Sequence, residues 1–219
     1  KNFIMFLKNY HHLKNKEIYI LIFLFLSSAL VRIPAILVLG DAGLDNEWKE
    51  IVSNLIEYGR FSYGELPNIY MPPLYAFYLY FFSIFNLEEH YYIQLILLSQ
   101  ILLATISVVV FYRINKLFFS QKISFYSSLL FSLFPLHIYA CSQISSISLQ
   151  TFFTILFFYL FFRLINKINV LSITLFSFTG GLLILLRGEF IAILILSLLS
   201  LFISFKIKKK KYFINSFNN

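Results

Sequence analysis

Acidic side chains are concentrated in one short segment of an otherwise apolar chain, residues 40–75. The segment holds six acids and only two bases, namely Asp41, Asp45, Glu47, Glu50, Glu57 and Glu65 against Lys49 and Arg60. A carboxylate held close to a substrate can act as a general base and take a proton from an acceptor hydroxyl. Because the segment joins two apolar stretches, we expect it to form an active site at a membrane surface.

Two arginines lie where apolar segments end or are interrupted, Arg32 and Arg187. A guanidinium group can donate two parallel hydrogen bonds to phosphate oxygens, so both residues are candidates for stabilising a phosphate leaving group. Either side chain could instead extend to the lipid headgroups. A pair between Arg187 and Glu189 would weaken the case for phosphate binding at that position.

Two further sets of residues could contribute to a site. His137 lies toward the end of an apolar segment, although a single histidine in a helix is more often a hydrogen-bonded structural residue. Asp41, Asp45 and Glu47 could together bind a divalent cation through oxygen ligands, or they could form a solvated acidic face. We expect no metal and no other cofactor.

The overall composition is that of a membrane protein. Of the 219 residues, 59% are hydrophobic and 13% charged, which leaves too few polar side chains to cover a soluble domain. The net charge of +8 would favour nucleic acid as the partner of a soluble protein, but here the basic residues flank apolar segments and orient the chain in the bilayer. We therefore predict an all-α, polytopic integral membrane protein that does not bind nucleic acid.

Five apolar stretches are long enough, or nearly so, to form transmembrane helices of about 20 residues. They are Ile18 to Leu39, Tyr92 to Tyr112, Ile123 to Cys141, Ile144 to Phe162 and Val170 to Phe205. The last stretch contains Arg187, Gly188 and Glu189, which would be costly at the bilayer centre and are better placed in a hairpin between two spans. The sequence therefore predicts six crossings within a single transmembrane domain, residues 1–219.

The distribution of basic residues predicts the orientation of these spans. If the short apolar segment Leu74 to Phe85 stays on one side as an interfacial or re-entrant helix, fourteen of the eighteen lysines and arginines face the cytoplasm. Residues 40–91, with eight acids and two bases, then form an outer-face loop. We expect a multi-pass protein of the inner (plasma) membrane with a cytoplasmic N-terminus and a retained first span. Because the sequence begins with Lys, we also expect a fragment or a shortened family member.

Within the outer loop, the spacing of apolar residues predicts an amphipathic helix over Asp45 to Tyr58 that lies flat on the membrane. Asp45 stands at the start of this helix, where a carboxylate can cap backbone N–H groups, or it can act in catalysis. Gly59 favours the end of the helix, and Pro72 with Pro73 makes a rigid corner before the next one. The loop should thus contain two short helices.

Several short motifs occur in a fixed order along the chain. They are Asp45 followed by Trp48, Asn54-Leu55-Ile56-Glu57-Tyr58-Gly59-Arg60-Phe61-Ser62, Pro72-Pro73-Leu74-Tyr75, Phe134-Pro135-Leu136-His137-Ile138-Tyr139, and Arg187. In this order they resemble the C-fold (GT-C) membrane glycosyltransferases of the dolichyl-phosphate-mannose protein mannosyltransferase and lipid A aminoarabinose transferase type. The chain departs from that pattern at Asn46, where relatives often have a second acid, and in the Ser145 to Ser148 turn, which lacks one.

The resemblance implies an inverting glycosyltransferase that moves a sugar from a polyprenyl-phosphate donor to a cell-envelope acceptor, which is a lipid, glycan or protein, at the outer face. In such an enzyme the catalytic residue is Asp45, and the substrate-binding residues are Glu47, Arg32, Arg187, Tyr75 and His137. It implies no metal, and its partners are the sugar donor, the envelope acceptor and the lipid bilayer. The alternative is a non-catalytic remnant, or a small membrane scaffold or transport protein, that retains the helical architecture.

Overall fold

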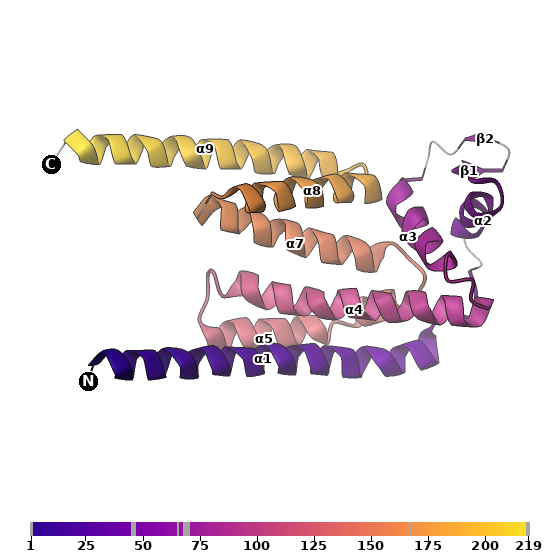
Figure 1. Ribbon diagram of the computed structural model, residues 1–219, viewed down its shortest axis with the longest axis horizontal. Helices are drawn as coiled ribbons and strands as arrows, with labels where there is room; N and C mark the ends of the chain where they lie inside the picture. Colours follow the sequence, from indigo (N-terminus) through magenta and orange to yellow (C-terminus); the bar gives the residue numbers. More distant parts are fainter. Residues whose placement is uncertain (1, 45–46, 65, 68–70, 167, 218–219) are drawn as a thin grey trace. The chain divides into compact units, whose positions relative to one another are not determined.

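The computed structural model describes residues 2–44, 47–64, 66–67, 71–166 and 168–217. These residues form nine helices and one two-stranded antiparallel hairpin (Figure 1), which agrees with the predicted all-α class. Contacts divide the chain into two compact units, residues 1–44 with 85–152 (unit 1) and residues 45–84 with 153–219 (unit 2). The single transmembrane domain stays a prediction.

Unit 1 is a bundle of long and short helices. It contains α1 (Asn2–Leu39), α4 (Glu89–Asn115), α5 (Gln121–Ser132), α6 (Pro135–Ser142) and the beginning of α7 (Ile147–Asn166). Helix α1 packs on α4, α5 and α6, and α4 packs on α5 and α6. Buried side chains fill these contacts, among them Leu24, Val108, Ala104 and Cys141. Helix α1 therefore has protein on one side, while its other side carries exposed apolar residues such as Leu30 that suit a lipid environment.

The predicted third span, Ile123 to Cys141, is broken near its middle. Helices α5 and α6 are bent by 48° relative to each other. Pro135 has no N–H group, so it cannot donate to the carbonyl of Phe131, which instead accepts from the N–H of Phe134 at 3.3 Å. The stretch is thus helical in two parts.

Three serines line one face of α5 at intervals of four residues, Ser124, Ser128 and Ser132, and all three are fully buried. Their hydroxyls donate to backbone carbonyls of the preceding turn at 2.9, 2.8 and 2.7 Å. Small side chains let helix backbones approach closely in a membrane, and hydroxyls that bond to their own chain need no outside partner. This face therefore allows α5 to pack closely on α1 and α4.

Unit 2 joins part of the predicted outer loop to the C-terminal helices. It comprises α2 (Trp48–Tyr58), β1 (Ser62–Tyr63), β2 (Leu66–Pro67), α3 (Pro73–Ser83), most of α7, α8 (Val170–Leu186) and α9 (Phe190–Phe217). Helix α2 packs on α3, and α3 packs on α8. Within this unit, α3 therefore connects the outer-loop segment to the C-terminal helices.

Helix α2 is amphipathic, as the sequence predicts, but another helix covers its apolar side. Ile51, Val52 and Leu55 are buried, and Ile51 and Leu55 pack with Ala76 of α3. The helix ends at Gly59, whose φ of 63° lies in the left-handed region that favours glycine. Helix α3 therefore covers part of the apolar side of α2, Ile56 on that side is 54% exposed, and the position of α2 on the membrane surface stays a prediction.

The C-terminal helices pack through large apolar side chains. Phe157 of α7 stacks on Phe176 of α8 with ring centroids 4.6 Å apart, and Phe190 of α9 belongs to the same cluster. The predicted stretch Val170 to Phe205 is divided at residues 187–189 into α8 and α9, which pack against each other. The predicted turn between two helices is therefore confirmed, and their crossing of the membrane stays a prediction.

Close packing around Gly180 predicts a strong effect of a larger residue at this position. A Cβ atom there would lie 3.0 Å from Cδ1 of Leu194 and 3.3 Å from Cε2 of Phe157. Replacing Gly180 by Leu should therefore overpack the contact of α8 with α7 and α9 and lower the free energy of unfolding by about 1–3 kcal/mol. Gly181→Leu is the matched control, because a Cβ atom at Gly181 has no such heavy atom within 4 Å. Denaturation in detergent measures both variants, and equal stabilities would contradict this account.

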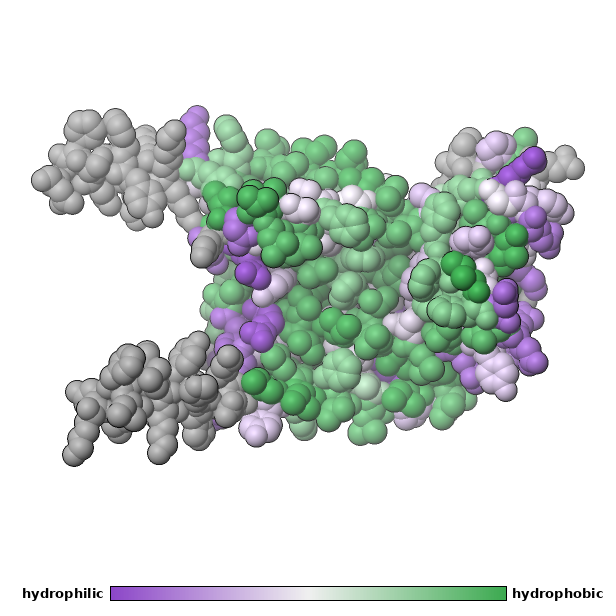
Figure 2. All heavy atoms as spheres, in the orientation of Figure 1, coloured by the Kyte–Doolittle hydropathy of each residue, from purple (hydrophilic) through white to green (hydrophobic). Residues whose placement is uncertain are grey.

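By length and composition, three helices of the described chain can cross a membrane, namely α4, α7 and the Lys16–Leu39 part of α1. The bent pair of α5 and α6 makes a fourth if it counts as one span, whereas α8 and the Phe190–Lys206 part of α9 are apolar but shorter. In Figure 2, apolar side chains dominate the surfaces of the long helices, and hydrophilic ones gather over α2 and its hairpin. The chain is therefore a membrane protein, and the six crossings stay a prediction.

Candidate functional site

The predicted catalytic residue, Asp45, and its neighbour Asn46 lie outside the residues that the structure describes. The predicted helix over Asp45 to Tyr58 corresponds to α2, which begins at Trp48. Glu47 stands directly before this helix, and its exposed side chain makes no capping hydrogen bond. The roles of Asp45 and Glu47 therefore stay predictions.

Arg32 is fully buried in unit 1, although it lies in the first predicted span. Its Nη1 atom donates hydrogen bonds to the carbonyl of Ser28 at 3.1 Å, to Oγ of Ser28 at 2.7 Å and to the carbonyl of Ser132 at 3.0 Å. Ser132 is the last residue of α5, directly before the break. Because none of Arg32 is exposed, its side chain does not extend to the lipid headgroups, which was the structural alternative for this residue.

The rest of the Arg32 guanidinium group has no hydrogen-bond acceptor. Nε and Nη2 are both buried without a partner among the described residues. No carboxylate in the described part of the chain forms an ion pair with Arg32. An arginine buried in a membrane span is energetically costly and marks a functional site by default. Arg32 is therefore the strongest candidate in the structure for binding an anionic group.

His137 and Cys141 of α6 lie within the electrostatic influence of Arg32. The imidazole ring of His137 packs edge-on against Phe131 with centroids 4.6 Å apart, and it lies 5.6 Å from the ring of Phe134. These aromatic contacts hold His137 beside the break between α5 and α6. The structure thus brings two predicted substrate-binding residues, Arg32 and His137, into one region of unit 1.

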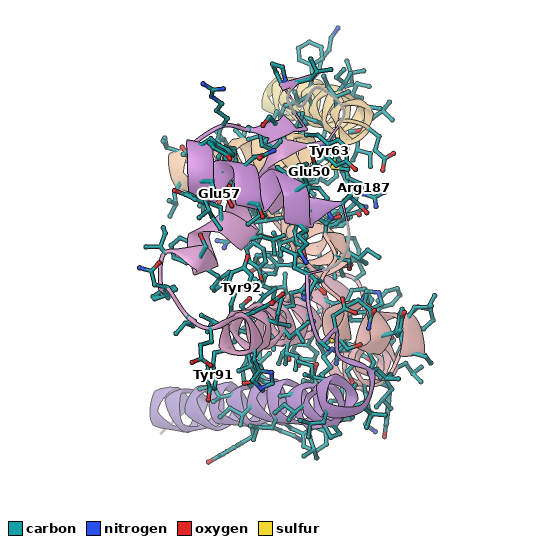
Figure 3. The ribbon with its side chains drawn as sticks, turned by 90° about the vertical axis from the view of Figure 1, so that its right-hand side faces the viewer. Glu50, Glu57, Tyr63, Tyr91, Tyr92 and Arg187 are labelled. Carbon is teal, nitrogen blue, oxygen red and sulfur yellow. The ribbon has the colours of Figure 1, made fainter. Side chains whose placement is uncertain are left out.

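Arg187 directly follows α8, at the predicted hairpin. Its Nη1 atom lies 3.5 Å from Oε1 of Glu189, and the two side chains are 43% and 69% exposed. Figure 3 labels Arg187 together with Glu50 and Tyr63 of the same unit. Arg187 therefore has a carboxylate partner, the arrangement that weakens the case for phosphate binding here, and its role stays a prediction.

Tyr75 is a core residue of unit 2. Its ring packs edge-on against Trp48 with centroids 5.0 Å apart and stacks on Tyr78 at 5.6 Å. None of the Tyr75 side chain is exposed. These contacts join α3 to the first turn of α2 and are those of a packing residue, while substrate binding by Tyr75 stays a prediction.

Two polar residues of α2 hold the β1–β2 hairpin, a role that was not predicted from the sequence. Oε1 of Glu50 accepts a hydrogen bond from the backbone N–H of Gly64 at 2.6 Å. Nδ2 of Asn54 donates to the carbonyl of Ser62 at 3.2 Å. Glu50 and Asn54 lie four residues apart and hence on one side of the helix, which is the signal that could have indicated a shared partner.

Replacing Glu50 by Ala should loosen the hairpin, because the Gly64 amide loses its acceptor. For a hydrogen bond at an exposed position we expect a loss of about 1 kcal/mol, which corresponds to about fivefold faster amide exchange. Hydrogen–deuterium exchange of the peptide that contains Ser62 to Gly64 measures the change. Glu57→Ala, on the same helix but without a described bond to the hairpin, is the control, and equal exchange in both variants would contradict the role of Glu50.

Asp41 has a structural role at the end of α1. Its Oδ2 atom accepts a hydrogen bond from the N–H of Ile144 at 2.6 Å, and its own N–H donates to the carbonyl of Ser142 at 3.1 Å. Nε2 of Gln143 donates to the carbonyl of Leu39 at 2.5 Å. These bonds tie the end of α1 to the turn between α6 and α7.

The candidate residues fall into two sets. Unit 1 holds Arg32 and His137, and unit 2 holds Glu47, Tyr75 and Arg187. Among the residues that the structure describes, no three His, Cys, Asp or Glu side chains gather into a metal site, and the independence from metal stays a prediction. The surroundings of Arg32 are the best candidate site, because its buried donors Nε and Nη2 have no hydrogen-bond acceptor among the described residues.

No protein-family model, no curated protein and no solved structure matches this chain. The resemblance to C-fold glycosyltransferases therefore stays a prediction from short motifs. The sequence and the structure together establish a helical membrane protein whose first apolar helix contains a fully buried arginine.

Proposed function

We propose that this protein is a C-fold membrane glycosyltransferase that transfers a sugar from a polyprenyl-phosphate donor to an acceptor in the cell envelope. Asp45 takes the proton of the acceptor hydroxyl, and Arg32 stabilises the departing phosphate. The other substrate-binding residues are Glu47, Arg187, Tyr75 and His137. The chain crosses the inner (plasma) membrane six times with a cytoplasmic N-terminus, so that residues 40–91 lie at the outer face.

The observation that supports this proposal most is the burial of Arg32 with Nε and Nη2 left without acceptors. In sugar transfer the leaving group is a phosphate, whose negative charge increases as the bond to the sugar breaks. A guanidinium group in a low-dielectric site stabilises such charge more strongly than one in water. Its bonds to Ser28 and Ser132 hold it in one orientation, so little reorganisation is needed when the charge develops.

The acidic outer loop supports the other half of the reaction. The acceptor oxygen forms a bond to the anomeric carbon, the bond from that carbon to the phosphate oxygen breaks, and the phosphate keeps the electron pair. The acceptor hydroxyl must lose its proton in this step, and a carboxylate such as Asp45 can take it. Asp41 of the same loop already accepts a hydrogen bond from Ile144, which leaves Asp45 and Glu47 as better candidates for the base.

Release of polyprenyl phosphate tests the proposal. The full chain in lipid nanodiscs is mixed with undecaprenyl-phosphate-linked pentose or hexose and with an extract of envelope lipids and glycans as acceptors. We expect time-dependent release of undecaprenyl phosphate and transfer of the labelled sugar, both unchanged by EDTA. Folded protein that releases nothing from either donor would contradict the proposal.

A second candidate function is that of a membrane scaffold or transport protein without catalytic activity. The pairing of Arg187 with Glu189 favours this alternative, because it gives one of the two predicted phosphate-binding residues a counter-ion of its own. The burial of Tyr75 in packing contacts points the same way. Under this alternative the release assay gives no product.

A further inference from the structure

We infer that Ser28 and the Ser132 carbonyl are positioning groups, which aim one edge of the Arg32 guanidinium at a lipid-borne phosphate within unit 1. The inference rests on the proposed function and specifies how the donor's phosphate is recognised. It also gives the break between α5 and α6 a role, because α5 ends there at Ser132 and the carbonyl of Ser132 accepts a hydrogen bond from Arg32.

The hydrogen bonds that Arg32 makes within the protein leave one edge of its guanidinium group for a ligand. A guanidinium group has five N–H donors, of which two belong to Nη1. Nη1 already has three acceptors, the carbonyl and Oγ of Ser28 and the carbonyl of Ser132. The three remaining donors belong to Nε and Nη2, which have no acceptor in the described part of the chain.

These remaining donors lie in the geometry that suits an oxyanion. The N–H bond of Nε and one N–H bond of Nη2 point in parallel from the same edge of the planar group, so they can bind two oxygens of one phosphate or carboxylate. A terminal pair on Nη1 and Nη2 would also be possible in a free arginine. Here the bonds of Nη1 to Ser28 and Ser132 leave the Nε–Nη2 edge for that purpose.

Two positioning groups come from different helices and act together. Ser28 lies one turn before Arg32 on α1, and its hydroxyl makes the shortest of the three bonds at 2.7 Å. Ser132 comes from α5, where the last carbonyls of a helix lack intrahelical donors and accept from side chains instead. Because Nη1 donates both hydrogen bonds, they fix the orientation of the guanidinium plane relative to the rest of the Arg32 side chain.

The surroundings favour an anionic ligand that is attached to an apolar chain. The thiol of Cys141 on α6 interacts with the guanidinium group, but Nε and Nη2 have no partner with hydrogen-bond geometry among the described residues. The same thiol donates to the carbonyl of Ile138 at 3.1 Å. Arg32 belongs to an apolar helix that is long enough to cross a membrane, so an anion attached to a hydrocarbon chain suits these surroundings. Prenyl phosphates and long-chain carboxylates share this chemistry, and we assign the site to the phosphate.

Ser28→Ala with Ser27→Ala as its control tests the positioning role. Ser27 is the adjacent residue, and its hydroxyl donates to the carbonyl of Leu24 at 3.2 Å and does not contact Arg32. Binding of undecaprenyl phosphate to the full chain in nanodiscs is compared with binding of the neutral undecaprenol and of hexadecanoate. Because a hydrogen bond to a charged group is lost, we expect Ser28→Ala to bind the phosphate about tenfold more weakly than Ser27→Ala.

A spectroscopic measurement separates positioning from general loss of structure. The chain has five arginines, and the Nε–H signal of Arg32 can be assigned in NMR spectra by comparison with Arg32→Lys. We expect undecaprenyl phosphate to shift this signal in the native protein and in Ser27→Ala, and undecaprenol to leave it unchanged. In Ser28→Ala, the shift should require about tenfold more ligand while the thermal unfolding midpoint stays near that of Ser27→Ala.

Each result decides between the inference and an alternative. Equal phosphate affinity in Ser28→Ala and Ser27→Ala, or an Arg32 signal that the phosphate does not move, would overturn the positioning role. Equal binding of hexadecanoate would overturn the assignment to phosphate. Phosphate binding of the expected kind without any sugar transfer would overturn the proposed function and leave this inference standing. Sugar transfer with an unchanged KM for the donor in Ser28→Ala would overturn this inference and leave the proposed function standing.

Discussion

Replacing Asp45 by Asn is expected to lower kcat for sugar transfer by a factor of about 10² to 10⁴, the usual contribution of a general base. Asparagine has nearly the same shape as aspartate but cannot take the proton of the acceptor hydroxyl. The KM for the polyprenyl-phosphate donor should change little, because the donor phosphate is recognised by Arg32 and not by the base. Initial rates of undecaprenyl phosphate release at several donor concentrations separate the two parameters.

Asp41→Asn is the matched control for this variant. Asp41 belongs to the same acidic loop, but its Oδ2 atom accepts a hydrogen bond from the N–H of Ile144. An asparagine oxygen can accept the same bond, so we expect activity within about twofold of the native protein. A loss of activity in Asp41→Asn but not in Asp45→Asn would move the base to Asp41, and full activity in both would exclude the two residues.

Most of the helical order could be predicted from the sequence, because apolar length and interrupting charges act locally. The charges of Arg187 and Glu189 divide a long apolar stretch where the structure has the turn between α8 and α9. The short apolar segment after Pro72 and Pro73 forms α3, which ends at Ser83 and is too short to cross a bilayer. Both predictions depend only on residues close together in the chain.

The contacts that cover a helix face could not be predicted in the same way. The apolar stripe of α2 indicates an amphipathic helix, but periodicity alone does not say whether lipid or protein covers that stripe. In the structure Ala76 of α3 packs on Ile51 and Leu55. Similarly, Pro135 is visible in the sequence and indicates a break, whereas the angle of 48° between α5 and α6 is known only from the structure.

The surroundings of Arg32 show the same limit for the candidate site. Ser28 is one helical turn away, so its bond to Arg32 could have been predicted from spacing. The other acceptor, the Ser132 carbonyl, is 100 residues away in the chain and comes near only through the packing of α5 on α1. Tertiary structure therefore decides which donors of Arg32 are used and which are left for a ligand.

Replacing Arg32 by Met is expected to abolish binding of undecaprenyl phosphate without a large loss of stability. Methionine is unbranched, is similar to arginine in volume and suits the apolar surroundings. Removing the buried charge removes its desolvation cost, and replacing buried ion pairs by apolar residues for the same reason is often neutral or stabilising by about 1–4 kcal/mol. The Ser132 carbonyl then loses a donor, at a cost of about 1–3 kcal/mol. Because these terms oppose each other, we expect a free energy of unfolding within about 2 kcal/mol of the native value.

Phosphate affinity, in contrast, should fall at least about 100-fold in Arg32→Met, since a buried charge-assisted bidentate contact is lost. Arg32→Lys is the informative second variant, because it keeps the positive charge but cannot offer two parallel donors. Binding and unfolding measured on the same nanodisc preparations compare the three proteins. If Arg32→Met unfolds readily while Arg32→Lys is stable and binds phosphate as the native protein does, the charge of Arg32 serves to hold α1 to the broken span, and the Nε–Nη2 edge has no part in recognition. If both variants keep the fold but lose phosphate binding, Arg32 serves to bind the ligand and is not needed for stability.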